Sequence, residues 1–254
     1  MMETNFTYLY DGTWENLIEL IFWLIKEKRK PLEIIEEEKY EPTLFNMPIK
    51  PIRNGNTKDM EKRMPRESLR IAYYVFLSNK KNKELIIYYF LLNSLKYQHQ
   101  IIYMRNLKCV NEALNIQKRV SREAHKWKGF LRFKETKNHF LYAEFNADNN
   151  ILGILAKHFQ KRLPKEYWLI KDQTRDILCI YDQKNLHFLE SKDLTINLKI
   201  EKEEIETEEL WKTFFQTIAI KERLNRKCQQ NFMPKKYWQN ILEMEGTYEK
   251  SDYR

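Results

Sequence analysis

The segment between Lys118 and Lys137 concentrates residue types that could bind a polyanion. Its basic residues outnumber the two acidic ones, Glu123 and Glu135, by six, and aromatic residues are interleaved with them. Cations at a helix end can contact phosphates, and aromatic side chains on an adjoining strand can stack on bases. The segment therefore predicts a nucleic-acid-binding surface, made by Lys118, Arg119, Arg122, Lys126, Lys128, Arg132, Lys134 and Lys137 together with Trp127, Phe130 and Phe133.

Arg119, Arg122 and Lys126 are three and four residues apart, so they share one face of the expected helix. A purely structural interpretation accounts for the same residues. A helix C-terminus favours Lys and Arg through its dipole, and the neighbouring aromatic side chains can belong to the core. The residues of this segment leave both interpretations open.

A second basic segment, from Lys221 to Trp238, contains a single acidic residue, Glu222. Cations, amides and aromatic side chains again occur together, which suits phosphates and base edges. The alternative is an amphipathic helix end with a solvated face. The candidate nucleic-acid-binding residues of this segment are Arg223, Arg226, Lys235, Lys236, Tyr237 and Trp238.

The five histidines show neither metal-site spacing nor a neighbouring cysteine. His158 lies on an apolar stripe, as a core histidine would. His125 adjoins the first basic segment, where an imidazole could transfer protons or stack on a base, so it is the one weak catalytic candidate. Phosphate-binding loops, the GxSxG motif and the zinc deaminase signature are absent. We therefore predict no metal and no cofactor, and a binding protein rather than an enzyme.

The composition is that of a folded, basic chain. Its 254 residues are 43% hydrophobic and 14% aromatic, enough for one large or two small domains. A net charge of +9 suits a polyanionic partner, or simply a soluble surface. Three widely spaced cysteines indicate buried thiols rather than a disulfide framework. The apolar stretches are too short to span a bilayer and no secretion signal is evident, so a cytoplasmic location without a membrane is expected.

The apolar patterning predicts an α+β protein with a mainly helical region over residues 1–118 and an α+β region over residues 119–254. The first should open with a strand at Phe6–Tyr10 and a helix capped by Thr13. Residues 31–65 contain five prolines and predict a loop-rich connector. Further helices are expected at about 66–78, 83–98 and 106–127, the second of them central because it is apolar all round.

In the second region, alternating residues at 129–134 and 139–145 predict a hairpin, and 151–162 a helix. Three more strands are expected, at 167–171, 177–181 and 186–189. This ββαβββ order predicts a small antiparallel sheet backed by a helix. C-terminal helices should follow, at about 207–224 after the acidic run Glu201–Glu209 and again near Pro234.

Four separate motifs resemble a known family. They are Tyr10–Trp14, Arg122–Phe133, Phe214–Ile220 and Phe232–Trp238, and they cover most of the chain in order. Together they are similar to the uncharacterised "probable DNA metabolism" proteins, with Trp127 in place of an expected methionine. The resemblance implies an association with DNA repair or modification and a radical SAM partner protein, and relatives fused to some uracil-DNA glycosylases. It implies no mechanism; its motif residues are Arg122, His125, Lys128, Gly129, Phe130, Arg132, Phe133, Phe232, Pro234, Lys235, Tyr237 and Trp238.

Three hypotheses follow from these residues and the resemblance. The first is a DNA-binding accessory protein that presents nucleic acid to the radical SAM partner. The second is an enzyme acting on a nucleic-acid base with His125 as general acid or base. The third is a protein adaptor that does not bind DNA and docks its partner through Trp127 and Trp238.

Overall fold

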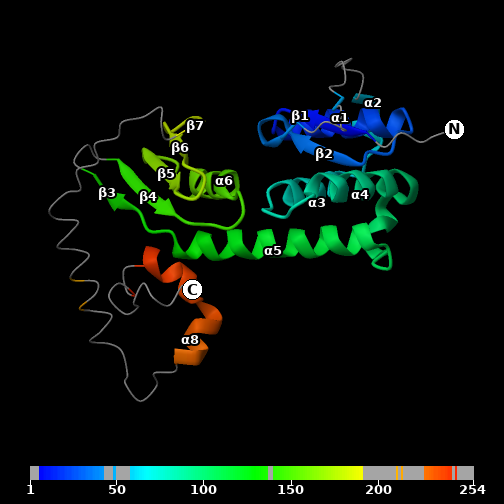
Figure 1. Cartoon of the computed structure of the whole chain (residues 1–254). Coiled ribbons are helices and arrows are strands. Elements are labelled where there is room, and N and C mark those ends of the chain that lie inside the picture. The colour runs from blue at the N-terminus through cyan, green and yellow to red at the C-terminus, as the bar shows by residue number, and fades with distance from the viewer. Residues whose placement is uncertain are drawn as a thin grey trace. The chain divides into compact units, whose positions relative to one another are not determined.

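The computed structural model describes residues 6–42, 48–49, 58–136, 140–190, 210, 213, 226–241 and 244. The fold is α+β, as the sequence predicts. The chain divides into two compact units, residues 1–122 and 123–254. Helix α5 (Lys108–Phe130) begins in the first unit and ends in the second (Figure 1).

Unit 1 combines a short parallel strand pair with several helices. The strands β1 and β2 pair from Thr7 opposite Glu33 to Tyr10 opposite Glu36. Thr13 caps the first helix as predicted, since its hydroxyl accepts a hydrogen bond from the Asn16 N–H. In chain order the described elements are β1 (Thr7–Tyr10), α1 (Trp14–Lys26), β2 (Glu33–Glu36), η1 (Glu37–Lys39), α2 (Lys58–Arg63), α3 (Arg66–Phe76), α4 (Lys83–Tyr97) and η2 (Gln98–Tyr103), followed by α5.

The expected loop-rich connector at residues 31–65 is wrong in part, because it contains β2 and α2. In β2 only two apolar residues stand between glutamates, too few to show an alternating pattern. The prediction of a central helix is confirmed for α4, whose Ile87, Phe90 and Leu91 are fully buried.

Tyr10 links three elements of unit 1 through its buried phenol. The hydroxyl oxygen lies 3.0 Å from a carboxylate oxygen of Glu84 on α4 and 3.2 Å from one of Glu36 on β2. A phenol has one hydrogen and can donate to one of these acceptors at a time. Burial raises the pKa of Glu84 and so favours the protonated carboxyl. A protonated Glu84 would remove the repulsion between two carboxylates that share the Tyr10 hydroxyl.

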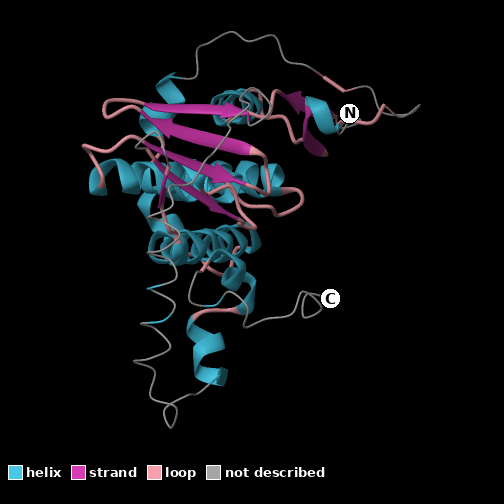
Figure 2. Ribbon diagram, turned by 90° about the vertical axis from the view of Figure 1, so that its left-hand side faces the viewer, coloured by secondary structure: helices cyan, strands magenta, loops and turns pink. Residues whose placement is uncertain are grey.

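Unit 2 is built on a five-stranded sheet with the strand order β3-β4-β5-β6-β7. Its strands are drawn in magenta in Figure 2. Helix α6 packs against β5 and β6. The ββαβββ order is confirmed. The elements are β3 (Lys134–Glu135), β4 (Leu141–Phe145), α6 (Leu152–Arg162), β5 (Trp168–Asp172), β6 (Ile177–Tyr181) and β7 (Leu186–Glu190), then α8 (Arg226–Phe232) and η5 (Lys235–Asn240).

The sheet differs from the predicted antiparallel one at a single pairing. Strands β4 and β5 run parallel, with Leu141 opposite Trp168, and α6 makes the crossover between them. The other three strand pairs are antiparallel. Alternation within a strand does not report the direction of its partner, so this error follows from the limits of the pattern.

The expected strand at Gly129–Lys134 is also wrong over most of its length. α5 continues to Phe130, and β3 consists of Lys134 and Glu135 only. Gly129 lies within the last turn of the helix, where an added Cβ would meet nothing within 4 Å. Neither a positive φ nor a close approach requires glycine there.

Among the residues that the structure describes, no helix is both long enough and apolar enough to cross a membrane. The predicted helix at 207–224, the acidic run Glu201–Glu209 and the Phe214–Ile220 motif lie outside the described residues, except for Leu210 and Thr213.

Candidate nucleic-acid interface

α5 places its basic side chains on a surface separate from its apolar stripe. The helix is amphipathic, and its buried residues include Val110, Ala113, Val120 and Trp127. Arg119, Arg122 and Lys126 follow one another at intervals of three and four residues, so they lie along one stripe of the helix. We call these three residues the α5 stripe.

Arg119 and Arg122 are the exposed cations of this stripe. Neither guanidinium group makes a hydrogen bond or an ion pair with any residue that the structure describes. Glu123 is the next residue along, but its side chain is buried and is bound to other partners. The two arginines therefore retain their full donor capacity for a ligand.

Lys126 is half-buried and leans on the second basic segment. Its ammonium nitrogen lies 5.5 Å from the centre of the Tyr237 ring, and that of Lys236 lies 5.0 Å from the same ring. Both distances fit cation–π contacts. The structure thus brings together Lys126 and the segment Lys235–Trp238, which we call the η5 segment.

The ammonium group of Lys236 is paired with two carboxylates of unit 2. Its ammonium lies 2.5 Å from Asp148 Oδ2 and 3.6 Å from Glu123 Oε1. Burial alone would lower the pKa of Lys236, but the hydrogen bond to Asp148 and the nearby negative charges raise it overall. Sequence reasoning gave no role to Asp148 or Glu123, because nothing local indicates that they meet a lysine 88 residues beyond Asp148.

Glu123 also fixes the backbone of the loop before α6. Its carboxylate accepts hydrogen bonds from the Asp148 N–H at 2.9 Å and the Asn149 N–H at 3.0 Å, and one from the Asn149 side-chain amide. Arg175 donates to the carbonyl oxygens of Ala147 and Asp148 in the same loop. The loop is therefore held by two charged groups, one from α5 and one from the β5–β6 turn.

The aromatic residues of the η5 segment are buried. Tyr237 and Trp238 are each only 3% exposed. The Tyr237 ring packs 5.3 Å from Trp127 and 5.3 Å from Phe130, centre to centre, and the Trp238 indole donates to the Met233 carbonyl oxygen at 2.8 Å. Trp127 is fully buried as well. None of these rings presents a face on which a base could stack in this conformation.

Two further predicted residues make contacts within unit 2. The Arg132 guanidinium donates to the Gly129 carbonyl oxygen at 2.7 Å. This bond gives a partner to a backbone carbonyl in the last turn of α5. Lys128 lies close enough to His158 that its charge, after burial and together with Arg162, lowers the pKa of that imidazole. Both residues are half-buried, so they offer less to a ligand than Arg119 and Arg122.

His125 is exposed near the end of α5. In the part of the chain that the structure describes, no carboxylate or carbonyl accepts a hydrogen bond from either ring nitrogen. A general base is commonly oriented by such a group.

The remaining predicted residues belong to the C-terminal part of the chain. Arg223 lies outside the described residues, and Arg226 is the first residue of α8. Lys235 is half-buried at the start of η5. Lys126 of the first predicted segment and Lys236 of the second meet across the Tyr237 ring.

Residues 81–243 match the family model of a domain of unknown function, DUF4130. This match covers more than half of the chain. The chain belongs to the DUF4130 family. Every predicted site residue from Arg119 to Trp238 lies within the matched range, whereas β1, β2 and α1 precede it. No curated protein and no solved structure matches the chain.

Proposed function

We propose that this protein is a DNA-binding accessory subunit that works in the cytoplasm with a radical SAM partner, and that the α5 stripe contacts the phosphates. The observation that carries the proposal is the pair Arg119 and Arg122, exposed on one helix stripe and unpaired among the described residues. The four motifs that resemble DNA metabolism proteins support the choice of DNA and of the partner.

The exposed guanidinium groups matter because cations that are paired with internal carboxylates are not available to bind phosphates. Each cation that neutralises a phosphate releases a condensed counterion, which favours binding at low salt. Lys126 adds a third cation to the stripe and lies beside Tyr237 as a half-buried residue.

The test is the affinity of the full chain for duplex and single-stranded DNA, measured by fluorescence anisotropy over a series of salt concentrations. Replacing Arg119→Gln and Arg122→Gln together should weaken binding roughly 10-fold or more near 0.1 M salt, and should make the slope of log K against log salt shallower by about 1.8. Lys62→Gln with Arg63→Gln is the matched control, since it removes the same charge from exposed positions on α2. Equal effects of the two double variants, or unchanged binding in the first, would contradict the proposal.

The two alternative functions have less support. An enzyme using His125 would need a group that orients the imidazole, and the described residues supply none. An adaptor that docks through Trp127 and Trp238 would need exposed indoles, and both are buried.

A further inference from the structure

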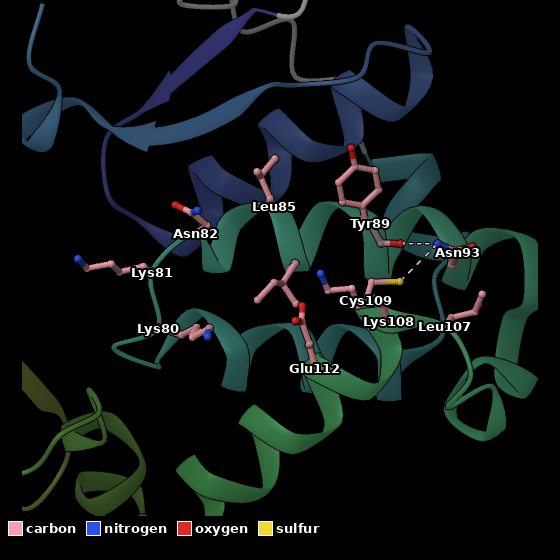
Figure 3. Close-up of a pocket in the computed structure, with 11 residues that line it drawn as sticks. Lys80, Lys81, Asn82, Leu85, Tyr89, Asn93, Leu107, Lys108, Cys109 and Glu112 are labelled. Carbon is pink, nitrogen blue, oxygen red and sulfur yellow. Dashed lines mark hydrogen bonds between the residues drawn. The ribbon is translucent and has the colours of Figure 1, made fainter.

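A cleft of about 630 Å³ opens in unit 1 between α4, the loop before it and the first turns of α5 (Figure 3). Pockets for small ligands typically have volumes of about 300–1,000 Å³. Lys80 and Lys81 lie at one end of the cleft and Leu107 at the other, with Cys109 and Glu112 between them. The family match begins at residue 81, so all the lining residues except Lys80 lie within the matched range.

Four charged side chains line the cleft. The ammonium groups of Lys80, Lys81 and Lys108 and the carboxylate of Glu112 form no ion pair with any described residue. Lys108 and Glu112 are four residues apart on α5, in the order that gives the weaker helix ion pair. A ligand that complements this lining carries an anionic group for the lysines. At a distance from that group it carries a hydrogen-bond donor for the Glu112 carboxylate.

The walls between these charges are aromatic and apolar. Tyr89 is 39% exposed, and Leu85 and Leu107 also line the cleft. The Tyr89 ring is held by Tyr88, which meets it edge-on with the ring centres 5.0 Å apart. A flat ring therefore has a positioned aromatic partner in the cleft.

Asn93 adds a fixed polar group. Its side-chain amide donates to the Tyr89 carbonyl oxygen at 2.8 Å and to Cys109 Sγ at 3.7 Å (Figure 3). These bonds use the amide nitrogen and leave the side-chain oxygen as an acceptor. With Glu112, the cleft then offers two acceptors for the donors on the edge of a ring.

We propose that this cleft binds a nucleoside phosphate. The base stacks on Tyr89, its amino or ring N–H groups donate to Glu112 and Asn93, and the phosphate lies at the end formed by Lys80 and Lys81. A fatty acid would leave Glu112 and Asn93 without partners, and inorganic phosphate would not use the aromatic wall. The α5 stripe is not needed for this site, which goes beyond the DNA contact proposed above.

The nucleoside phosphate can be a free nucleotide or one nucleotide of a strand. The arrangement of α5 makes the second source accessible, because Lys108, Glu112, Asn115, Arg119 and Arg122 follow one another at intervals of three and four residues on the helix. A strand bound along Arg119 and Arg122 would reach the cleft about 10 Å farther along the helix axis, given a rise of about 1.5 Å per residue.

The first experiment measures binding of each of the four nucleoside 5′-monophosphates to the full chain by calorimetry. Tyr89→Ala should weaken binding about 10-fold or more, because stacking of one base on an aromatic ring is worth that much. Tyr103→Ala is the matched control, since Tyr103 is 81% exposed and does not line the cleft. Lys80→Gln with Lys81→Gln should weaken binding of the monophosphates and leave binding of the corresponding nucleosides unchanged.

The second experiment uses Cys109 as a reporter in a Cys228→Ser background. Cys179 is fully buried, and burial raises the pKa of its thiol to about 12, so Cys109 is the thiol that a maleimide reaches. A nucleotide in the cleft should slow alkylation of Cys109. Protection by monophosphates identifies free nucleotides as ligands, and protection by single-stranded oligonucleotides alone identifies a nucleotide of a strand.

The proposal is overturned if neither monophosphates nor oligonucleotides bind or protect Cys109, or if Tyr89→Ala and Tyr103→Ala have the same effect. The Arg119→Gln/Arg122→Gln variant separates the two proposals. This variant should lose affinity for DNA and keep its affinity for the monophosphates. DNA binding by the α5 stripe and nucleotide binding by the cleft can therefore be disproved separately.

Discussion

The α5 stripe and the η5 segment carry the same kinds of residue and use them differently. Arg119 and Arg122 stand exposed without a described partner, whereas Lys236 is held by Asp148 and Glu123. Tyr237 and Trp238, which resemble a stacking platform in the sequence, are covered by the rest of unit 2. Cations next to aromatic residues therefore do not by themselves indicate a binding surface, and the presence of an internal acidic partner decides between the two roles.

The largest expected difference between the two regions is in stability. Trp238→Ala should lower the free energy of unfolding by about 3–5 kcal/mol, because it empties a buried indole site. Arg119→Ala should change it by less than about 0.5 kcal/mol, since its side chain is exposed. Urea unfolding followed by circular dichroism measures both. A small effect of Trp238→Ala would place the η5 segment on the surface and restore it as a binding candidate.

A smaller effect is expected at the acidic partner itself. Glu123→Gln should cost about 1–3 kcal/mol, because an amide group replaces one of the two oxygens that accept from the 148–149 backbone. Glu166→Gln removes an equal charge from an exposed position in the same unit and should be near neutral. The same urea titration applies. If the two variants are equally stable, Glu123 does not hold the η5 segment and its loop in place.

The smallest effect concerns Lys128, whose role lies between those of the two regions. The pKa of His158 is lowered by burial and then by the charges of Lys128 and Arg162, so Lys128→Gln should raise it toward the ordinary value. A histidine with a lowered pKa binds protons more weakly in the folded state, so stability is lost as the pH falls from about 6.5 through the lowered pKa of the folded state. Lys128→Gln narrows the gap between the two pKa values, so the variant should lose less stability on acidification.

Proton NMR of the His158 ring over a pH series measures the change at Lys128, with Lys118→Gln as the exposed control. An unchanged His158 pKa in Lys128→Gln would show that Lys128 extends into solvent. It would then be counted with the α5 stripe.

Much of the local structure can be predicted from the sequence. The strand Ile177–Tyr181 matches its expected bounds, and α6 begins one residue later than expected, because alternating and helical periods are strong there. The end of α5 is not predicted correctly, because the alternating pattern at 129–134 indicates a strand where the helix continues to Phe130. The parallel β4–β5 pair was missed because partner direction is a property of the assembled sheet.

The candidate site is predictable only in part, for a similar reason. The spacing of Arg119 and Arg122 on a helix follows from the sequence, and the structure keeps them on the surface. The burial of Tyr237 depends on Trp127, a residue far away in the chain, so no local pattern could indicate it. The cleft beside Tyr89 could not be predicted from the sequence, because its lining comes from separate elements and each residue type is ordinary.

The contacts of Glu123 and Trp127 with the η5 segment also set an order of events during synthesis. Both residues emerge from the ribosome long before Lys236 and Tyr237, and long-range contacts of this kind form late. Until then the Trp127 indole lacks the Tyr237 ring as cover. A nascent chain that stops before Pro234 therefore displays an aromatic patch of the kind that chaperones and proteases recognise, and the packing of unit 2 around Trp127 waits for the η5 segment to be made.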